Sequence, residues 1–199
     1  YRGQLLALLD GGIRLLLVRR TYQELESNHI RFLRQTLAGI AEYRSGTRQF
    51  LFPNGSVLDF GYCACDADMD RYQGAEYDVI FLDEATQLRE EWMRQFAACL
   101  RGVNDFPKRI YYTCNPGGPG HGYIKRLFID RRFKTGENPE DYAFIPARVT
   151  DNRVLLESQP NMPITIPTMA EVPAARPSSP SVRLVPLEQA RITKMITST

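Results

Sequence analysis

Residues 77–84, with the sequence YDVIFLDE, constrain the fold of this chain more than any other stretch. Five of the first six residues are apolar, and the run ends in two adjacent carboxylates, Asp83 and Glu84. A short apolar run of this kind is typical of a strand that is buried on both faces of a parallel sheet. Open parallel sheets bind ligands beyond the carboxyl ends of their strands, so the two acids are candidates for a functional site.

The acidic pair has the chemistry of a nucleotide-hydrolysing site. Asp83, at the end of the strand, can hold a water-bound Mg²⁺. Glu84 is turned differently and can polarise the water that attacks a γ-phosphate. This is the Walker B pattern followed by a catalytic glutamate. The alternative is a buried strand that merely ends in a solvated Asp-Glu pair, since short motifs also occur by chance.

A second apolar stretch, residues 109–114, leads into the sequence TCNPGG at residues 113–118. Thr113 and Asn115 would lie at the same sheet edge as Asp83, where both can hydrogen-bond a water or a γ-phosphate oxygen. The alternative is an Asn-Pro-Gly turn that needs only turn chemistry. The glycine-rich residues 117–122 do not fit the dinucleotide fingerprint G-x-G-x-x-G, so we interpret them as a flexible loop.

Strands and helices alternate along the rest of the chain. Residues 13–18 predict another strand, and Thr21 can cap a helix that continues to Leu37. Residues 49–60 predict a β-hairpin around the turn sequence PNGS. Apolar residues at helical spacing predict a helix over residues 86–101 whose aromatic stripe faces the core. This order favours an α/β fold with a mostly parallel sheet flanked by helices and an inserted hairpin.

Composition separates the end of the chain from the rest. Residues 157–199 hold seven of the 13 prolines and no aromatic residue, which is typical of a segment that cannot build a core. We therefore expect a domain over residues 1–156 and a disordered tail over residues 157–199. The formal net charge of +2 does not indicate nucleic-acid binding. No C-x-x-C pair and no apolar run of about 18 residues occurs, which favours a reduced, cytosolic protein without a membrane span.

Some polar residues allow a functional and a plain structural interpretation. A basic helix near residues 123–133 could contact DNA phosphates or present a solvated face. Arg19 and Arg20 at a strand end could reach a phosphate or form a structural pair. Zinc binding by Cys63 and Cys65 with a histidine is disfavoured, because the spacing fits no zinc pattern. The cations of the basic helix are Lys125, Arg126, Arg131 and Arg132.

Four separated motifs occur in an order that resembles the ATPase domain of the large terminase subunit of tailed bacteriophages and prophages. They are FPNGS at residues 52–56, YQGAEYD at 72–78, DEAT at 83–86 and TCNPGG at 113–118. The sequence VTDN at residues 149–152 is similar to the segment that leaves the ATPase core in that family. The resemblance covers roughly residues 10–160.

The resemblance implies a P-loop NTPase-like fold and an ATP-driven motor that packages double-stranded DNA into a procapsid. It implies that Asp83 is the Mg²⁺-associated Walker B acid and Glu84 the catalytic base. Thr113 and Asn115 would belong to the motif that couples hydrolysis to DNA movement. ATP and Mg²⁺ are the implied cofactors. The implied partners are DNA, the portal protein, the small terminase subunit and other copies in a ring, in the cytoplasm of a bacterial host.

The chain also departs from the family. It contains no G-x-x-x-x-G-K-[ST] sequence, so the P-loop and the strand before it are expected to be missing. Residues 109–114 would then lack a neighbouring strand on one side, and the fragment alone would be inactive. The nuclease domain is also expected to be absent. Two other functions stay open, namely a non-catalytic prophage remnant that at most binds DNA or a partner, and a helicase-like P-loop ATPase.

Overall fold

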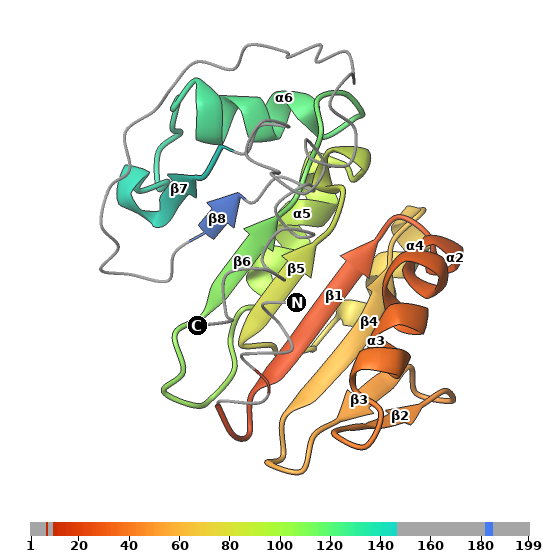
Figure 1. Cartoon of the computed structure of the whole chain (residues 1–199). Helices are drawn as coiled ribbons and strands as arrows, with labels where there is room; N and C mark the ends of the chain where they lie inside the picture. Colours follow the sequence, from red (N-terminus) through yellow and green to blue (C-terminus); the bar gives the residue numbers. More distant parts are fainter. Residues whose placement is uncertain (1–6, 8–9, 147–181, 185–199) are drawn as a thin grey trace, which may run out of the picture.

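The computed structural model describes residue 7, residues 10–146 and residues 182–184 of the chain. An eight-stranded sheet runs through this part of the chain in the order β2-β3-β4-β1-β5-β6-β8-β7 (Figure 1). The strands are β1 (Arg14–Arg19), β2 (Glu42–Arg44), β3 (Gln49–Leu51), β4 (Val57–Tyr62), β5 (Val79–Leu82), β6 (Arg109–Tyr112), β7 (Tyr142–Phe144) and β8 (Val182–Leu184).

The middle of the sheet is parallel, as the sequence predicts. Strand β1 pairs in parallel with β4 on one side and β5 on the other, and β5 pairs in parallel with β6. Strands β3 and β4 form the predicted antiparallel hairpin, and β2 adds a third antiparallel strand beside β3. The carboxyl ends of β1, β5 and β6 therefore meet at one edge, which is where the acidic pair and Thr113 were expected.

Helical segments cover both faces of the sheet. They are α2 (Tyr22–Leu25), η1 (Glu26–Ile30), α3 (Arg31–Thr36), α4 (Asp66–Met69), η2 (Asp70–Tyr72), η3 (Ala85–Gln87), α5 (Glu90–Ala98), α6 (His121–Ile124), η4 (Lys125–Ile129) and η5 (Pro139–Asp141). Thr21 caps α2 as predicted, because its hydroxyl accepts a hydrogen bond from the Glu24 amide at 3.3 Å. The predicted helix over residues 86–101 is broken, because Leu88 and Arg89 adopt extended backbone angles between η3 and α5.

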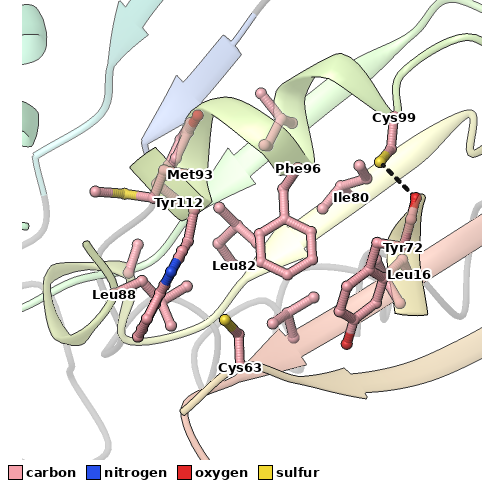
Figure 2. Close-up of a cluster of buried hydrophobic side chains, with 14 of the residues drawn as sticks. Leu16, Cys63, Tyr72, Ile80, Leu82, Leu88, Met93, Phe96, Cys99 and Tyr112 are labelled. Carbon is pink, nitrogen blue, oxygen red and sulfur yellow. Dashed lines mark hydrogen bonds between the residues drawn. The ribbon is translucent and has the colours of Figure 1, made fainter. Parts of the chain in front are cut away.

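Two apolar clusters lie on opposite faces of the sheet, because successive strand residues point to opposite sides. Leu15 and Val79 pack toward the α2–α3 side, whereas Leu16 and Ile80 pack toward α5. The second cluster also contains Phe96, which Figure 2 shows surrounded by side chains from the sheet and from Tyr72. The aromatic stripe of the 86–101 region is thus part of the core, as predicted. Within the described residues, no helix has the length and apolar character needed to cross a membrane.

Strand β6 has a neighbour on each side, so the expectation that it lacks one is wrong. Strand β8 lies between β6 and β7 and is parallel to both. Its three residues belong to the segment that we expected to be a disordered tail. The structure instead places these three residues in the sheet. The rest of residues 157–199, like the helix expected at the start of the chain, lies outside the described residues except for Ala7.

Candidate active site at the carboxyl edge of the sheet

Backbone hydrogen bonds extend the sheet beyond the ends of three strands and fix the first residues of the site. The Asp83 amide donates to the Val18 carbonyl of β1 at 2.9 Å. The Thr113 amide donates to the Leu82 carbonyl of β5 at 3.0 Å. Asp83 and Thr113 therefore have rigid backbone positions on neighbouring strands, and Arg19 ends the strand on the other side of β5.

Asp83 is buried and is surrounded by three polar side chains. Its Oδ1 accepts a hydrogen bond of 2.5 Å from the Thr113 hydroxyl. Its Oδ2 lies 2.7 Å from Nε2 of His29 and 2.8 Å from Nε of Arg19. The Arg19 Nε–H does not point along this contact, so it is an ion pair and not a hydrogen bond. A buried carboxylate with such partners is stabilised in its charged form.

The balance of these effects determines the protonation of Asp83. Burial raises the pKa of Asp83, but the hydrogen bond and charge of His29 lower it, as do the Thr113 hydrogen bond and the Arg19 charge. The lowering effects are larger together, so the pKa of Asp83 lies below its ordinary value. Asp83 is consequently a carboxylate at neutral pH.

Glu84 points in a different direction from Asp83, because its backbone is left-handed. Its φ of 51° and ψ of 46° are uncommon for a residue other than glycine and are concentrated at functional sites. The Glu84 amide donates to the Thr113 hydroxyl oxygen at 3.2 Å, and Oε1 lies 2.7 Å from Nη2 of Arg19. The side chain of Glu84 is 37% exposed, against 6% for Asp83, so a water molecule can reach it.

Thr113 enters the site through its side chain, whereas Asn115 enters through its backbone. The Asn115 carbonyl oxygen accepts a hydrogen bond of 2.9 Å from the Thr86 hydroxyl, and the residue is exposed. The structure thus brings Asp83, Glu84 and Thr113 together and places Asn115 beside them at the same edge.

The donor set at Asp83 fits a magnesium ion held through water. Carboxylate and hydroxyl oxygens suit Mg²⁺, which usually keeps several of its waters. Within the described part of the chain Oδ1 of Asp83 accepts the Thr113 hydrogen bond alone, and a carboxylate oxygen has room for a second. Among the described residues there is no group of three or more His, Cys, Asp or Glu side chains that could hold a metal ion.

His29 is the site residue that sequence reasoning missed, whereas for Arg19 it left a phosphate contact and a structural pair open. Arg19 is buried and forms ion pairs with both acids. His29 reaches Asp83 from η1, 54 residues earlier in the chain. Its position within a predicted helix contains no signal for this contact, because the contact depends on how that helix packs on the sheet. The sequence pattern of this helix predicted only which of its residues face the core.

Two glycines hold the loop after Thr113 against the segment after Glu84. The Gly120 amide donates to the Thr86 carbonyl at 2.9 Å. A Cβ atom on Gly118 would lie 2.3 Å from the Thr86 carbonyl oxygen, and one on Gly120 would lie 2.3 Å from that of Leu88. Gly118 also has a φ of +85°, which side chains rarely permit. This close approach requires glycine at both positions.

Gly118→Ala should therefore destabilise the protein by about 1–3 kcal/mol through steric conflict and backbone strain. Thermal or urea denaturation measures the loss. Gly122→Ala is the matched control, because Gly122 lies within α6 and a Cβ there would meet nothing within 4 Å. Alanine is favoured over glycine by roughly 0.5–1 kcal/mol inside a helix, so this control should gain stability. An equal change in both variants would contradict the proposed close approach.

The basic helix near residues 123–133 is shorter than predicted, and its leading cations are paired. Lys125 lies 2.5 Å from Asp130, and Arg126 forms a two-pronged ion pair with Glu137 at 2.7 and 2.9 Å. The Arg131 guanidinium lies over the Phe133 ring, and Arg132 is exposed. These contacts favour a structural role for Arg126 in particular, because its side chain is only 19% exposed.

The Arg126–Glu137 pair has a defined pH dependence. The Arg126 hydrogen bonds, aided by the Lys134 amide, outweigh burial and lower the pKa of Glu137 from 4.5 to about 2. The resulting stabilisation is present above pH 4.5 and is lost as the pH falls toward about 2. Glu137→Gln should cost about 1–3 kcal/mol at neutral pH. The difference from wild type, measured by urea denaturation, should shrink over that acidic range. Exposed Glu140→Gln should show no such trend, and a Glu137→Gln difference that is constant with pH would contradict the pairing.

The fold is a mostly parallel α/β sheet with an acidic pair at the carboxyl edge, and the comparisons with known proteins show the family. Residues 13–171 match the family of the N-terminal region of T4-like large terminase subunits, and this chain belongs to that family. No curated protein sequence matches the chain.

Solved structures of the large terminase from a thermophilic bacteriophage share the fold. One crystal form of that protein is 20% identical with a TM-score of 0.54, and its ADP complex is 19% identical with the same TM-score. Its complex with ATP-γ-S is 18% identical with a TM-score of 0.50. Each covers 65% of this chain, which spans only 32–33% of the length of the thermophilic phage protein.

Proposed function

We propose that this chain forms the ATP-hydrolysing core of a large terminase subunit, an ATP-driven motor that packages double-stranded DNA into phage procapsids. One observation carries the proposal. Two consecutive acids follow a central parallel strand, and the left-handed backbone of Glu84 separates a buried Asp83 from a water-accessible Glu84. The binding of ADP and ATP-γ-S by the thermophilic phage terminase supports a nucleotide as the ligand.

The two acids have different roles in this proposal. Glu84 orients the attacking water and accepts its proton, while Arg19 holds the Oε1 side of its carboxylate in place. Asp83, with the Thr113 hydroxyl, would hold Mg²⁺ through water. When bound, that ion neutralises charge on the β- and γ-phosphates. The hydrogen bonds and charges of its partners outweigh burial and keep Asp83 charged, which is the state required for this role.

Thr113 and Asn115 would sense the γ-phosphate in this proposal. Thr113 contacts both acids, since it donates to Asp83 and accepts from the Glu84 amide. Asn115 is tied to Thr86, two residues after Glu84. A change at the phosphate would thus alter both strand ends at once. DNA, the portal protein, the small terminase subunit and further copies in a ring are the proposed partners, in the cytoplasm of a bacterial host.

A second candidate function is a non-catalytic remnant that at most binds DNA or a partner. The observation in its favour is that these 199 residues contain no G-x-x-x-x-G-K-[ST] sequence. The backbone and lysine of that motif position the β- and γ-phosphates in P-loop ATPases. A helicase-like ATPase has no specific support beyond the shared strand-end chemistry.

The test is ATP hydrolysis with and without a P-loop. The 199-residue chain alone should hydrolyse negligible ATP. The same chain fused behind a P-loop-bearing segment of a related terminase should show Mg²⁺-dependent hydrolysis that DNA stimulates. A fusion that melts cooperatively and binds nucleotide without hydrolysing it would support the non-catalytic remnant. Strong hydrolysis by the unfused chain would contradict the assignment to P-loop chemistry.

A further inference from the structure

Three tyrosines and three arginines that do not belong to the acidic site form a continuous row. The Arg48 guanidinium lies 4.2 Å from the Tyr22 ring centroid and 5.8 Å from that of Tyr62. These two rings are 6.4 Å apart, and Arg71 lies 4.2 Å from the Tyr62 ring. At the other end, the neighbouring Tyr22 adds to burial in raising the pKa of Tyr43, and Arg34 lies 5.4 Å from the Tyr43 ring. The arginine–tyrosine row is thus Arg34, Tyr43, Tyr22, Arg48, Tyr62 and Arg71.

The row contains cations that the protein does not neutralise. Arg71 is ion-paired with Asp68, and the Tyr22 hydroxyl donates to Glu26 at 3.2 Å. Neither Arg34 nor Arg48 forms an ion pair within the described residues. This contrasts with Lys125 and Arg126, whose charges are satisfied by nearby acids. Arg34 and Arg48 are therefore two cations of the row that stack on tyrosine rings and are not paired with an acid of the described residues.

Arg48 is held in an unusual backbone conformation. Its φ is 57°, a value that favours glycine, yet an arginine stands at this position. Its carbonyl accepts a hydrogen bond of 3.1 Å from the Phe60 amide of β4, which fixes the backbone there. The result is a guanidinium placed against the Tyr22 and Tyr62 rings. Such strained positions are concentrated at functional sites.

The row and the acidic site share one segment of chain. Arg19, at the end of β1, contacts Asp83 and Glu84, and Tyr22 follows three residues later. The partner of Arg19 in the sheet register is Tyr62, which also belongs to the row. The row therefore begins at the same carboxyl edge of the sheet as the candidate site.

We propose that the arginine–tyrosine row contacts the phosphate backbone of double-stranded DNA. This rests on the proposed function for the identity of the ligand. The chemistry follows from the residues, because a planar guanidinium binds phosphate with paired hydrogen bonds and stacking on tyrosine keeps that plane oriented. Contacts of this kind position a duplex without reading its sequence. Arg34 and Arg48 are the two phosphate contacts, and the tyrosines hold them in place.

The salt dependence of DNA binding tests this inference. The affinity of the 199-residue chain for a short labelled duplex is measured by fluorescence anisotropy over a range of salt concentrations. Each phosphate contact contributes about 0.9 to the slope of log K against log salt. Arg34→Gln and Arg48→Gly should each reduce the slope by about that amount. Glycine suits the positive φ at residue 48, so this variant keeps the backbone and should still melt cooperatively.

Arg44→Gln is the matched control on the same hairpin. Arg44 is exposed but ion-paired with Glu42 at 3.1 Å, so its loss should leave the slope unchanged. Unchanged slopes for Arg34→Gln and Arg48→Gly, or no binding by wild type at low salt, would overturn the inference. Equal competition by a poly-glutamate peptide would assign the row to an acidic protein partner instead, which also overturns it.

The outcome is separable from that of the proposed function. Glu84→Gln should leave the salt slope intact, because Glu84 lies outside the row. If the salt slope falls in Arg34→Gln and Arg48→Gly but the P-loop fusion does not hydrolyse ATP, only the proposed hydrolytic function is contradicted. If the fusion hydrolyses ATP in a Glu84-dependent way but the salt slope is unchanged in the two arginine variants, only the DNA-contact role of the row is contradicted.

Discussion

Glu84→Gln in the P-loop fusion should reduce the rate of ATP hydrolysis by about 10²–10⁴-fold, the range typical of a lost general base. Glutamine has nearly the same shape as glutamate, and its amide can still meet the solvent at this partly exposed position. It cannot accept the proton of the attacking water. Nucleotide affinity should change little, because Glu84 acts on the water and not on the bound phosphates in the proposed mechanism.

The measurement pairs single-turnover hydrolysis with nucleotide binding. Glu91→Gln is a suitable control, since Glu91 is an exposed acid on α5 outside the site. The control should retain the full rate. If Glu84→Gln retained more than about a tenth of the wild-type rate, another residue would be the base, because general acid–base catalysis is worth at least about 10²-fold.

Phe96→Ala should have the largest effect on stability, with a loss of about 3–5 kcal/mol. Phe96 is completely buried on α5 and packs edge-on against Tyr72, with ring centroids 4.7 Å apart (Figure 2). Its removal leaves a cavity between α5 and the sheet, where surrounding side chains are held by both elements. The cost combines lost burial with the empty volume that remains.

Urea denaturation of the 199-residue chain measures this loss. Val103→Ala is the control, because Val103 is 95% exposed and its substitution should change stability by less than about 0.5 kcal/mol. Comparable effects for the two variants would mean that α5 is not packed on the sheet as described.

The parallel strands and the position of the acidic pair could be predicted because local patterns specify them. Residues 79–82 form a continuous apolar run, and polar residues follow where the strand ends. The same local logic missed β8, since Val182–Leu184 stands among prolines and its pairing depends on residues far away in the chain.

Local sequence patterns also could not predict which polar side chains pair with one another. The helix containing His29 was predicted, but its contact with Asp83 depends on packing between helix and sheet. Arg126 looked free in the sequence because its partner Glu137 lies eleven residues away across a turn. Charge on an isolated motif is therefore a weak guide to DNA binding until its ion pairs are known.

The contacts of Gly118 and Gly120 join the segment after Glu84 to the loop before α6. Because Gly120 is hydrogen-bonded to Thr86 and Gly118 packs closely against the Thr86 carbonyl, we expect residues 85–88 and residues 118–120 to move together. Gly120 directly precedes α6, so we expect a rotation at Glu84 to be passed on to that helix. A change in the backbone angles of Glu84 is thus expected to shift the position of α6.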